Sequence, residues 1–209
     1  QLTSGATNVA IGYLALALLT TGSNNMAIGP SALASINSGS NNTAVGQSAG
    51  ASLTGGGSNV AIGGNSLQNS STGGSNVAIG VNAMFFATAS DNTAIGSSAM
   101  EGSPMGSSGT ENTAVGRSAL KNFTSGSNNT AIGYETLDAL TTGARNTAIG
   151  TSALGANIVG NDNVGIGHEA LLLNTGNNNV AVGPQALDAN TSGARNTAIG
   201  TSALGANIV

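Results

Sequence analysis

Few side chains in this sequence of 209 residues could do acid–base or metal chemistry. It has 1 histidine, His168, with 8 acidic residues, 4 basic residues and no cysteine. Thiol catalysis and thiolate metal sites are therefore excluded, and a single histidine offers little for general-base catalysis. His168 directly follows a glycine, at a position where other parts of the chain carry Tyr13, Pro30 or Arg117. Such variability is typical of an outward turn, so His168 is interpreted as a surface residue.

The acidic residues do not recur at a fixed spacing, and the calcium-binding pattern Gly-Gly-x-Gly-x-Asp does not occur. We interpret them as solvated charges in turns. The sequence therefore predicts no catalytic residue, no metal site and no cofactor. The acidic residues are Asp91, Glu101, Glu111, Glu135, Asp138, Asp162, Glu169 and Asp188.

The composition excludes further classes of protein. Only 6% of the residues are charged and 2% are aromatic, against roughly a quarter charged in typical domains. Disordered chains combine high net charge with low hydropathy, whereas this chain has a net charge of −4 and a mean hydropathy of +0.13. Four basic residues are too few for a nucleic-acid partner. The longest apolar run, Tyr13–Leu19, is shorter than the roughly 20 residues that cross a bilayer, so we expect no membrane insertion in this segment.

A repeated string dominates the chain. Asn-x-Ala-(Ile/Val)-Gly occurs twelve times, with Gly165 replacing the alanine in one copy. Successive copies are 17 residues apart in most cases, with intervals of 16 and 20 as exceptions. The asparagines that open the string are Asn8, Asn25, Asn42, Asn59, Asn76, Asn92, Asn112, Asn129, Asn146, Asn163, Asn179 and Asn196.

Each repeat contains two short apolar segments separated by Gly- and Asn-rich turns. The second segment is usually Ala-Leu, as in Ala119-Leu120, and a further glycine often follows, as at Gly126. Glycine costs about 1 kcal/mol inside a helix, and the segments are too short for stable helices. Short β segments are therefore predicted, and each repeat becomes one coil of a β-solenoid. Coils stacked at roughly 4.8 Å would form a rod of about 58 Å, in which each coil buries its apolar side against its neighbours.

The recurring asparagines are predicted to have a structural role. In a solenoid, equivalent residues of successive coils lie over one another, so their amides can form a hydrogen-bonded ladder. Asparagine also tolerates left-handed turn conformations. A ligand-binding residue would not be needed in every coil, and we therefore expect a turn-and-ladder role.

The strand pattern suggests contact with a second chain. In Thr-Ala-Ile or Val-Ala-Ile, the outer two residues lie on one face and alanine on the other. Both faces are apolar or small, which is typical of a strand buried on both sides. We infer that one face lines the coil interior and the other meets another copy, in a parallel homo-oligomer of three chains. The alternative is a monomer with alanine inside and isoleucine under a loop.

The repeats resemble those of a known group of fibre proteins. Residues 129–137, Asn-Thr-Ala-Ile-Gly-Tyr-Glu-Thr-Leu, and 146–154, Asn-Thr-Ala-Ile-Gly-Thr-Ser-Ala-Leu, are similar to repeats of trimeric autotransporter adhesin heads. They are still more similar to arrays in bacteriophage tail-fibre-like proteins. The resemblance implies a left-handed parallel β-roll, three chains side by side, and attachment to a surface. The unit here is longer than that of adhesin heads.

One coil departs from the regular spacing. Residues 97–111 contain three extra residues and include Glu101 and Met105, and Phe85 and Phe86 lie in the preceding coil. Insertions in solenoids emerge as loops that often bind partners, so these four residues form a candidate contact loop. The alternative is a bulged turn with phenylalanine packed beneath it.

A near-identical duplication bears on domain organisation. Residues 141–159 and 191–209 differ only at Thr142 and Ser192. We interpret residues 1–209 as a single repeat array, a fragment of a longer fibre that continues beyond Val209.

We expect a structural rod in an extracellular, cell-surface or virion fibre, which displays a tip domain that binds an unknown surface receptor. The alternative is an adhesive head whose side surface binds a receptor or matrix. Two further functions are disfavoured. Only a third of each coil matches the hexapeptide of β-helical acyltransferases. An ice-binding array of Thr43, Thr93, Thr113, Thr130, Thr147 and Thr197 is interrupted by Val or Met.

Overall fold

The computed structural model describes residues 3–205, and within that range it contains short strands and no helix. Each copy of the repeated string forms one strand of three residues. This confirms the all-β prediction. The strands are β1 (Val9–Ile11), β2 (Met26–Ile28), β3 (Thr43–Val45), β4 (Val60–Ile62), β5 (Val77–Ile79), β6 (Thr93–Ile95), β7 (Thr113–Val115), β8 (Thr130–Ile132), β9 (Thr147–Ile149), β10 (Val164–Ile166), β11 (Val180–Val182) and β12 (Thr197–Ile199).

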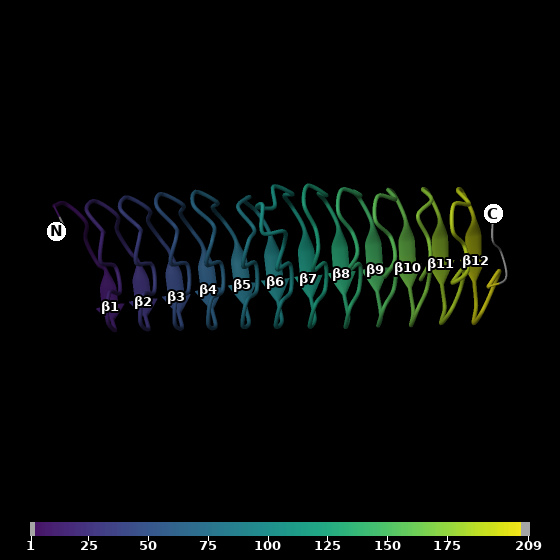
Figure 1. Ribbon diagram of the computed structural model, residues 1–209, viewed down its shortest axis with the longest axis horizontal. Coiled ribbons are helices and arrows are strands. Elements are labelled where there is room, and N and C mark those ends of the chain that lie inside the picture. Colours follow the sequence, from purple (N-terminus) through teal and green to yellow (C-terminus); the bar gives the residue numbers. More distant parts are fainter. Residues whose placement is uncertain (1–2, 206–209) are drawn as a thin grey trace.

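The strands form one parallel sheet in chain order, from β1 to β12. Equivalent residues pair between neighbours, as Ala131 does with Ala148. Figure 1 shows the strands side by side along the long axis of the molecule. With strands roughly 4.8 Å apart, the eleven steps span about 53 Å. The chain is therefore a β-solenoid of roughly 17-residue coils, as its repeat predicts.

The second apolar segment of each coil is a turn, whereas the sequence pattern predicted a second β segment. Glu135 and Leu137 both have φ of 51°, in the left-handed region that an extended strand does not use. The Ala153 N–H closes a local turn on the Gly150 carbonyl oxygen at 3.3 Å. The segment still bonds to its neighbour, because the Leu120 N–H donates to the Thr136 carbonyl oxygen at 2.9 Å. Stacking between coils therefore continues without a second strand.

The core is a narrow column inside the coils. It contains the strand alanines, such as Ala131, the leucines of the Ala-Leu segments, such as Leu137, and a third position occupied by Phe123 or Leu140. All four are fully buried. The alanine face of the strand thus lines the interior. The isoleucine face points outward, and Ile132 is 38% exposed, so no loop covers it.

Close contact between coils explains the glycine that ends each string. Gly150 has φ of +128°, and a Cβ added there would lie 2.5 Å from the Gly167 carbonyl oxygen. Both the backbone conformation and the space exclude a side chain. The equivalent glycines of the preceding strings meet the same contact, for example Gly46 against Gly63, whereas a Cβ on Gly200 in the last string would meet nothing within 4 Å.

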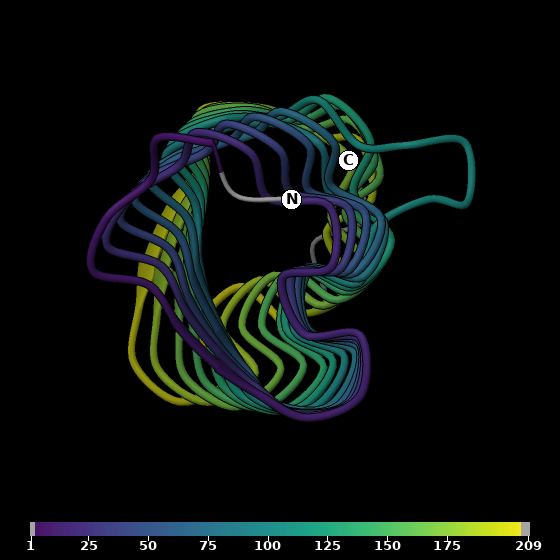
Figure 2. The same cartoon turned by 90° about the vertical axis from the view of Figure 1, so that its left-hand side faces the viewer.

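The irregular coil keeps its place in the stack and carries a projecting loop. Figure 2 shows this loop in teal, outside the common outline of the other coils. Its base is closed, because Ser107 pairs with Ala87 in an isolated bridge and a Cβ on Gly102 would lie 3.2 Å from the Ser107 Cβ. The Gly106 N–H donates to the Ser103 carbonyl oxygen at 2.8 Å, which forms a tight turn at the tip.

Candidate functional site: the asparagine ladder, the projecting loop and the outer sheet face

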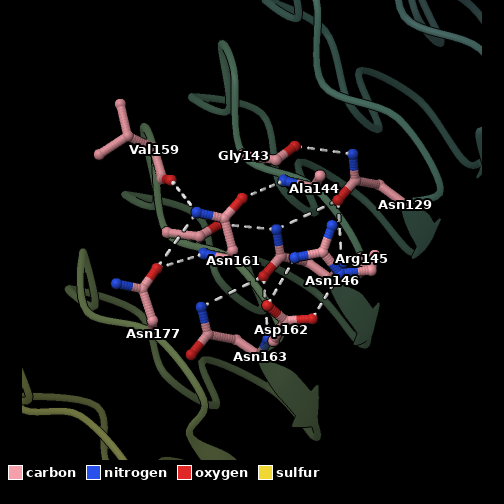
Figure 3. Close-up of polar contacts among 11 residues, drawn as sticks. Asn129, Gly143, Ala144, Arg145, Asn146, Val159, Asn161, Asp162, Asn163 and Asn177 are labelled. Carbon is pink, nitrogen blue, oxygen red and sulfur yellow. Dashed lines mark hydrogen bonds and ion pairs between the residues drawn. The ribbon is translucent and has the colours of Figure 1, made fainter.

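The asparagine column forms a hydrogen-bonded ladder inside the solenoid. The Asn129 side chain is buried. Its Nδ2 donates to Asn112 Oδ1 in the preceding coil at 3.1 Å and to the Gly143 carbonyl oxygen in the following coil at 2.9 Å. Its Oδ1 accepts the Asn146 backbone N–H at 3.0 Å. A ladder asparagine with a neighbour on each side therefore ties three coils together (Figure 3).

The ladder runs without a break from Asn8 to Asn196. At every step the backbone N–H of one asparagine donates to the Oδ1 of the preceding one, at 2.9–3.0 Å. The left-handed backbone falls on the preceding residue, such as Asn128 with φ of 61°, and not on the ladder asparagine as the sequence suggested. The side-chain oxygens of the ladder are committed to neighbouring coils, so the ladder is a structural element and not a binding surface.

A second group of buried asparagines was missed in the sequence. Asn157, Asn174 and Asn190 occupy the interior position that holds Leu140 in the coil before them. Asn190 Nδ2 donates to Asn174 Oδ1 at 2.6 Å, and Asn157 Oδ1 accepts the Gly160 N–H at 2.8 Å. Their spacing of 17 and 16 residues matches the repeat and indicates that they occupy equivalent positions in successive coils. This spacing is hard to recognise in the sequence because asparagine is also common in the turns of this chain.

Among the described residues, two ion pairs join neighbouring coils at the surface, Lys121 with Glu101 at 3.8 Å and the closer pair of Arg145 with Asp162. Arg145 binds Asp162 through two hydrogen bonds, Nε to Oδ1 at 2.6 Å and Nη2 to Oδ2 at 2.8 Å (Figure 3). The bonded guanidinium lowers the pKa of Asp162 below its ordinary value. Both residues directly precede a ladder asparagine, so this pair extends the stacking to the surface.

The remaining charges occupy turns on the outside of the rod. Burial, together with the charge of Glu135, raises the pKa of the Asp138 carboxyl. The Arg117 guanidinium lies 5.5 Å from the centre of the Tyr134 ring. His168 Nδ1 is 3.7 Å from Glu169 Oε2, and the histidine side chain is 56% exposed. His168 thus lies on the surface, where the sequence placed it.

The structure separates the residues of the candidate contact loop. Met105, at the tip of the projecting loop, is 96% exposed. Glu101 lies at the base, half-buried, and its carbonyl oxygen accepts the Phe86 N–H at 2.8 Å. Phe85 and Phe86 are half-buried on the preceding coil, with ring centres 4.5 Å apart at an angle of 85°. Met105 is therefore the only one of the four that projects from the rod.

The outward face of the sheet is uncharged along its length. In every strand the third residue is Ile or Val, and the first is Thr, Val or Met. These residues are half-buried or exposed, as Thr130 and Ile132 are. A face of this kind has no chemistry for catalysis, but it suits contact with another protein surface.

Three features are absent from the part of the chain that the structure describes. No pocket was found there, no cluster of three His, Asp or Glu side chains is able to hold a metal ion, and no helix is long and apolar enough to span a membrane. In comparisons with known proteins, no family model, curated protein or solved structure matches the chain.

Proposed function

We propose that this chain is a structural rod segment of an extracellular fibre, on a cell surface or a virion, that holds a tip domain for attachment to a surface. The observation that carries this proposal is the unbroken asparagine ladder, in which every step repeats the same hydrogen bonds. Such a stack transmits force through backbone and amide hydrogen bonds along its axis. The tip domain would then bind the unknown surface receptor, and the rod would set its distance from the body.

The proposed assembly is a parallel homotrimer whose chains meet through the outward face of the sheet. The exposed isoleucines support this, because Ile62, Ile95 and Ile132 are each 38% exposed at one strand position. A single chain leaves this row in water. Side-by-side copies would bury it along the whole rod.

Mass measurement on the purified chain tests the assembly. We expect a trimer mass from light scattering, and the Ile132→Glu variant should lower it towards that of a monomer, because a buried carboxylate without a partner is strongly unfavourable. Thr151→Glu is the matched control, since Thr151 is exposed in a turn. A monomer mass for the unaltered chain would contradict the assembly.

A second candidate function is an adhesive head whose side surface binds a receptor or matrix. The observation that favours it is the projecting loop, which presents Met105 to solvent on a closed base. The loop is not needed for stacking. Gly96 and Gly116 are 20 residues apart, and deletion of residues 103–106 leaves 16, the spacing between Gly80 and Gly96.

Attachment assays with the full fibre separate the two functions. The deletion of residues 103–106 should leave attachment and thermal stability unchanged if the chain is a rod, whereas an adhesive head that uses the loop would lose attachment. A second variant with the exposed turn residues scrambled extends the test to the whole side surface. Loss of attachment in either variant, with the solenoid intact by circular dichroism, would favour the adhesive head.

A further inference from the structure

The outward face of the sheet carries two rows of side chains. The third strand residues form one row, which is Ile or Val throughout. The first strand residues form the other, named here the first row, which mixes three residue types in an irregular order. The first row is Val9, Met26, Thr43, Val60, Val77, Thr93, Thr113, Thr130, Thr147, Val164, Val180 and Thr197.

The size and charge of this face point to a second copy as its occupant. Three residues per strand and eleven steps of roughly 4.8 Å give a strip on the order of 500 Å². This is comparable with the largest apolar patches on typical monomers. Two such strips approach the roughly 1,200 Å² of the smallest specific interfaces. No charge lies in either row to select a different partner, so the strip is complementary to itself.

A repetitive face creates a problem of alignment. Neighbouring coils present nearly the same side chains, so two parallel copies shifted by one coil would bury almost the same surface. Strand pairings without a specific pattern slip for this reason. In the related case of coiled coils, a single polar residue in an apolar seam fixes the register.

We propose that the threonines of the first row set the axial register between side-by-side copies of this chain. The inference rests on the proposed parallel assembly, with the first row placed next to the rotation axis, where each first-row residue lies against its own counterparts at the same level. In register, threonine then meets threonine and valine meets valine at every level. The hydroxyls of these threonines have no hydrogen-bond partner within the described residues, so they are free to bond across the interface.

A shift of one coil would leave several of these hydroxyls against apolar side chains. Each unpaired hydroxyl disfavours the shifted packing by roughly tenfold. The facing pairs that would combine threonine with valine or methionine are Met26 with Thr43, Thr43 with Val60, Val77 with Thr93, Thr147 with Val164, and Val180 with Thr197.

The test removes the threonine pattern and measures the register. In the test variant all six first-row threonines become valine: Thr43, Thr93, Thr113, Thr130, Thr147 and Thr197. Valine already occupies this position in five coils, so the solenoid is expected to fold. A matched control replaces the exposed turn residues Thr151 and Thr201 with valine.

Single introduced cysteines can report the axial register between two copies, because the native chain contains no cysteine. Val60→Cys and Val77→Cys lie on neighbouring coils of the first row. The two proteins carry different tags, are unfolded and refolded together, and are then oxidised. A disulfide between Cys at 77 in two copies reports aligned chains, and one between Cys at 60 and Cys at 77 reports a shift of one coil.

With native threonines, and in the control, we expect disulfides between identical positions. In the six-valine variant the mixed disulfide should rise at least about tenfold, while the mass of the oligomer stays unchanged. A persistent single register in that variant, or mixed disulfides with native threonines, would overturn the register proposal and leave the assembly standing. A monomer mass for the native chain would overturn both.

Discussion

At the scale of single residues, the ladder asparagine is the most informative side chain. It is a neutral amide with two donors and one acceptor. Inside the solenoid it satisfies two backbone groups of the following coil and bonds to the amide oxygen of the preceding one. A shorter side chain does not reach both neighbouring groups, and a carboxylate does not supply the two N–H donors. Because the same bonds recur at every step, the effect of one substitution can be predicted from a single position.

Asn129→Ala should lower the free energy of unfolding by about 2–4 kcal/mol, because it leaves the Gly143 carbonyl oxygen and the Asn146 N–H buried without partners. Chemical denaturation measures this. Asn122→Ala is the matched control. Asn122 is exposed and bonds only to the Asp138 carbonyl oxygen, so its loss should cost less than about 0.5 kcal/mol. Equal effects of the two variants would contradict the ladder.

Two aspartates should give opposite responses to pH. The raised pKa of Asp138 means that the folded state binds its proton more tightly, so stability falls as pH rises from the unfolded value of 3.8. Asp138→Asn should therefore be more stable than the native chain at neutral pH and equal to it in acid. The pKa of Asp162 is lowered instead, so its charged form stabilises the folded state and this stabilisation is lost as pH falls. Asp162→Asn should therefore be less stable than the native chain at neutral pH, with a difference that closes in acid. Denaturation midpoints across this pH range check both, and differences that do not vary with pH would contradict the assignment.

At the scale of elements, the sequence predicted the strands and misjudged what joins them. The three-residue strands follow from a string that recurs with a fixed alanine and a fixed closing glycine. The Ala-Leu segment resembled a strand because it is apolar, but apolarity reports burial and not backbone conformation. Leu120 and Leu137 adopt left-handed φ of 52° and 51°, which the residue type does not signal. The sequence also did not determine whether the strand alanine faces the interior or the outside. In the structure, Ala131 lies in the core.

Two glycines differ sharply in what a side chain would meet. Gly150→Ala should destabilise the protein by about 3 kcal/mol or more, since it forces alanine into a strained φ of +128° and against the Gly167 carbonyl. A Cβ on Gly64 would meet nothing within 4 Å, so Gly64→Ala should be neutral or stabilising by up to about 1 kcal/mol. Thermal unfolding of both variants compares them. A tolerated Gly150→Ala would contradict the close stacking of the coils.

At the scale of the whole molecule, the distribution of charge distinguishes two parts of the chain. No Asp, Glu, Lys, Arg or His occurs before Asp91, so salt and pH act on these side chains only from Asp91 onward. The sequence predicted the stacked architecture because its repeat is nearly invariant. It did not determine how the proposed copies would align, because neighbouring coils of the uncharged sheet face present nearly the same side chains. The candidate loop at Met105 was found from a single irregular interval.

In a stacked solenoid, every added repeat should lengthen a rod of constant cross-section. A variant in which residues 141–190 are inserted again after Asn190 adds three coils, following the duplication that the sequence already contains. Small-angle X-ray scattering compares its longest dimension and cross-section with those of the native chain. We expect an increase of about 14 Å in length and no change in cross-section. A thicker particle, or one of the same length, would contradict the stacked architecture.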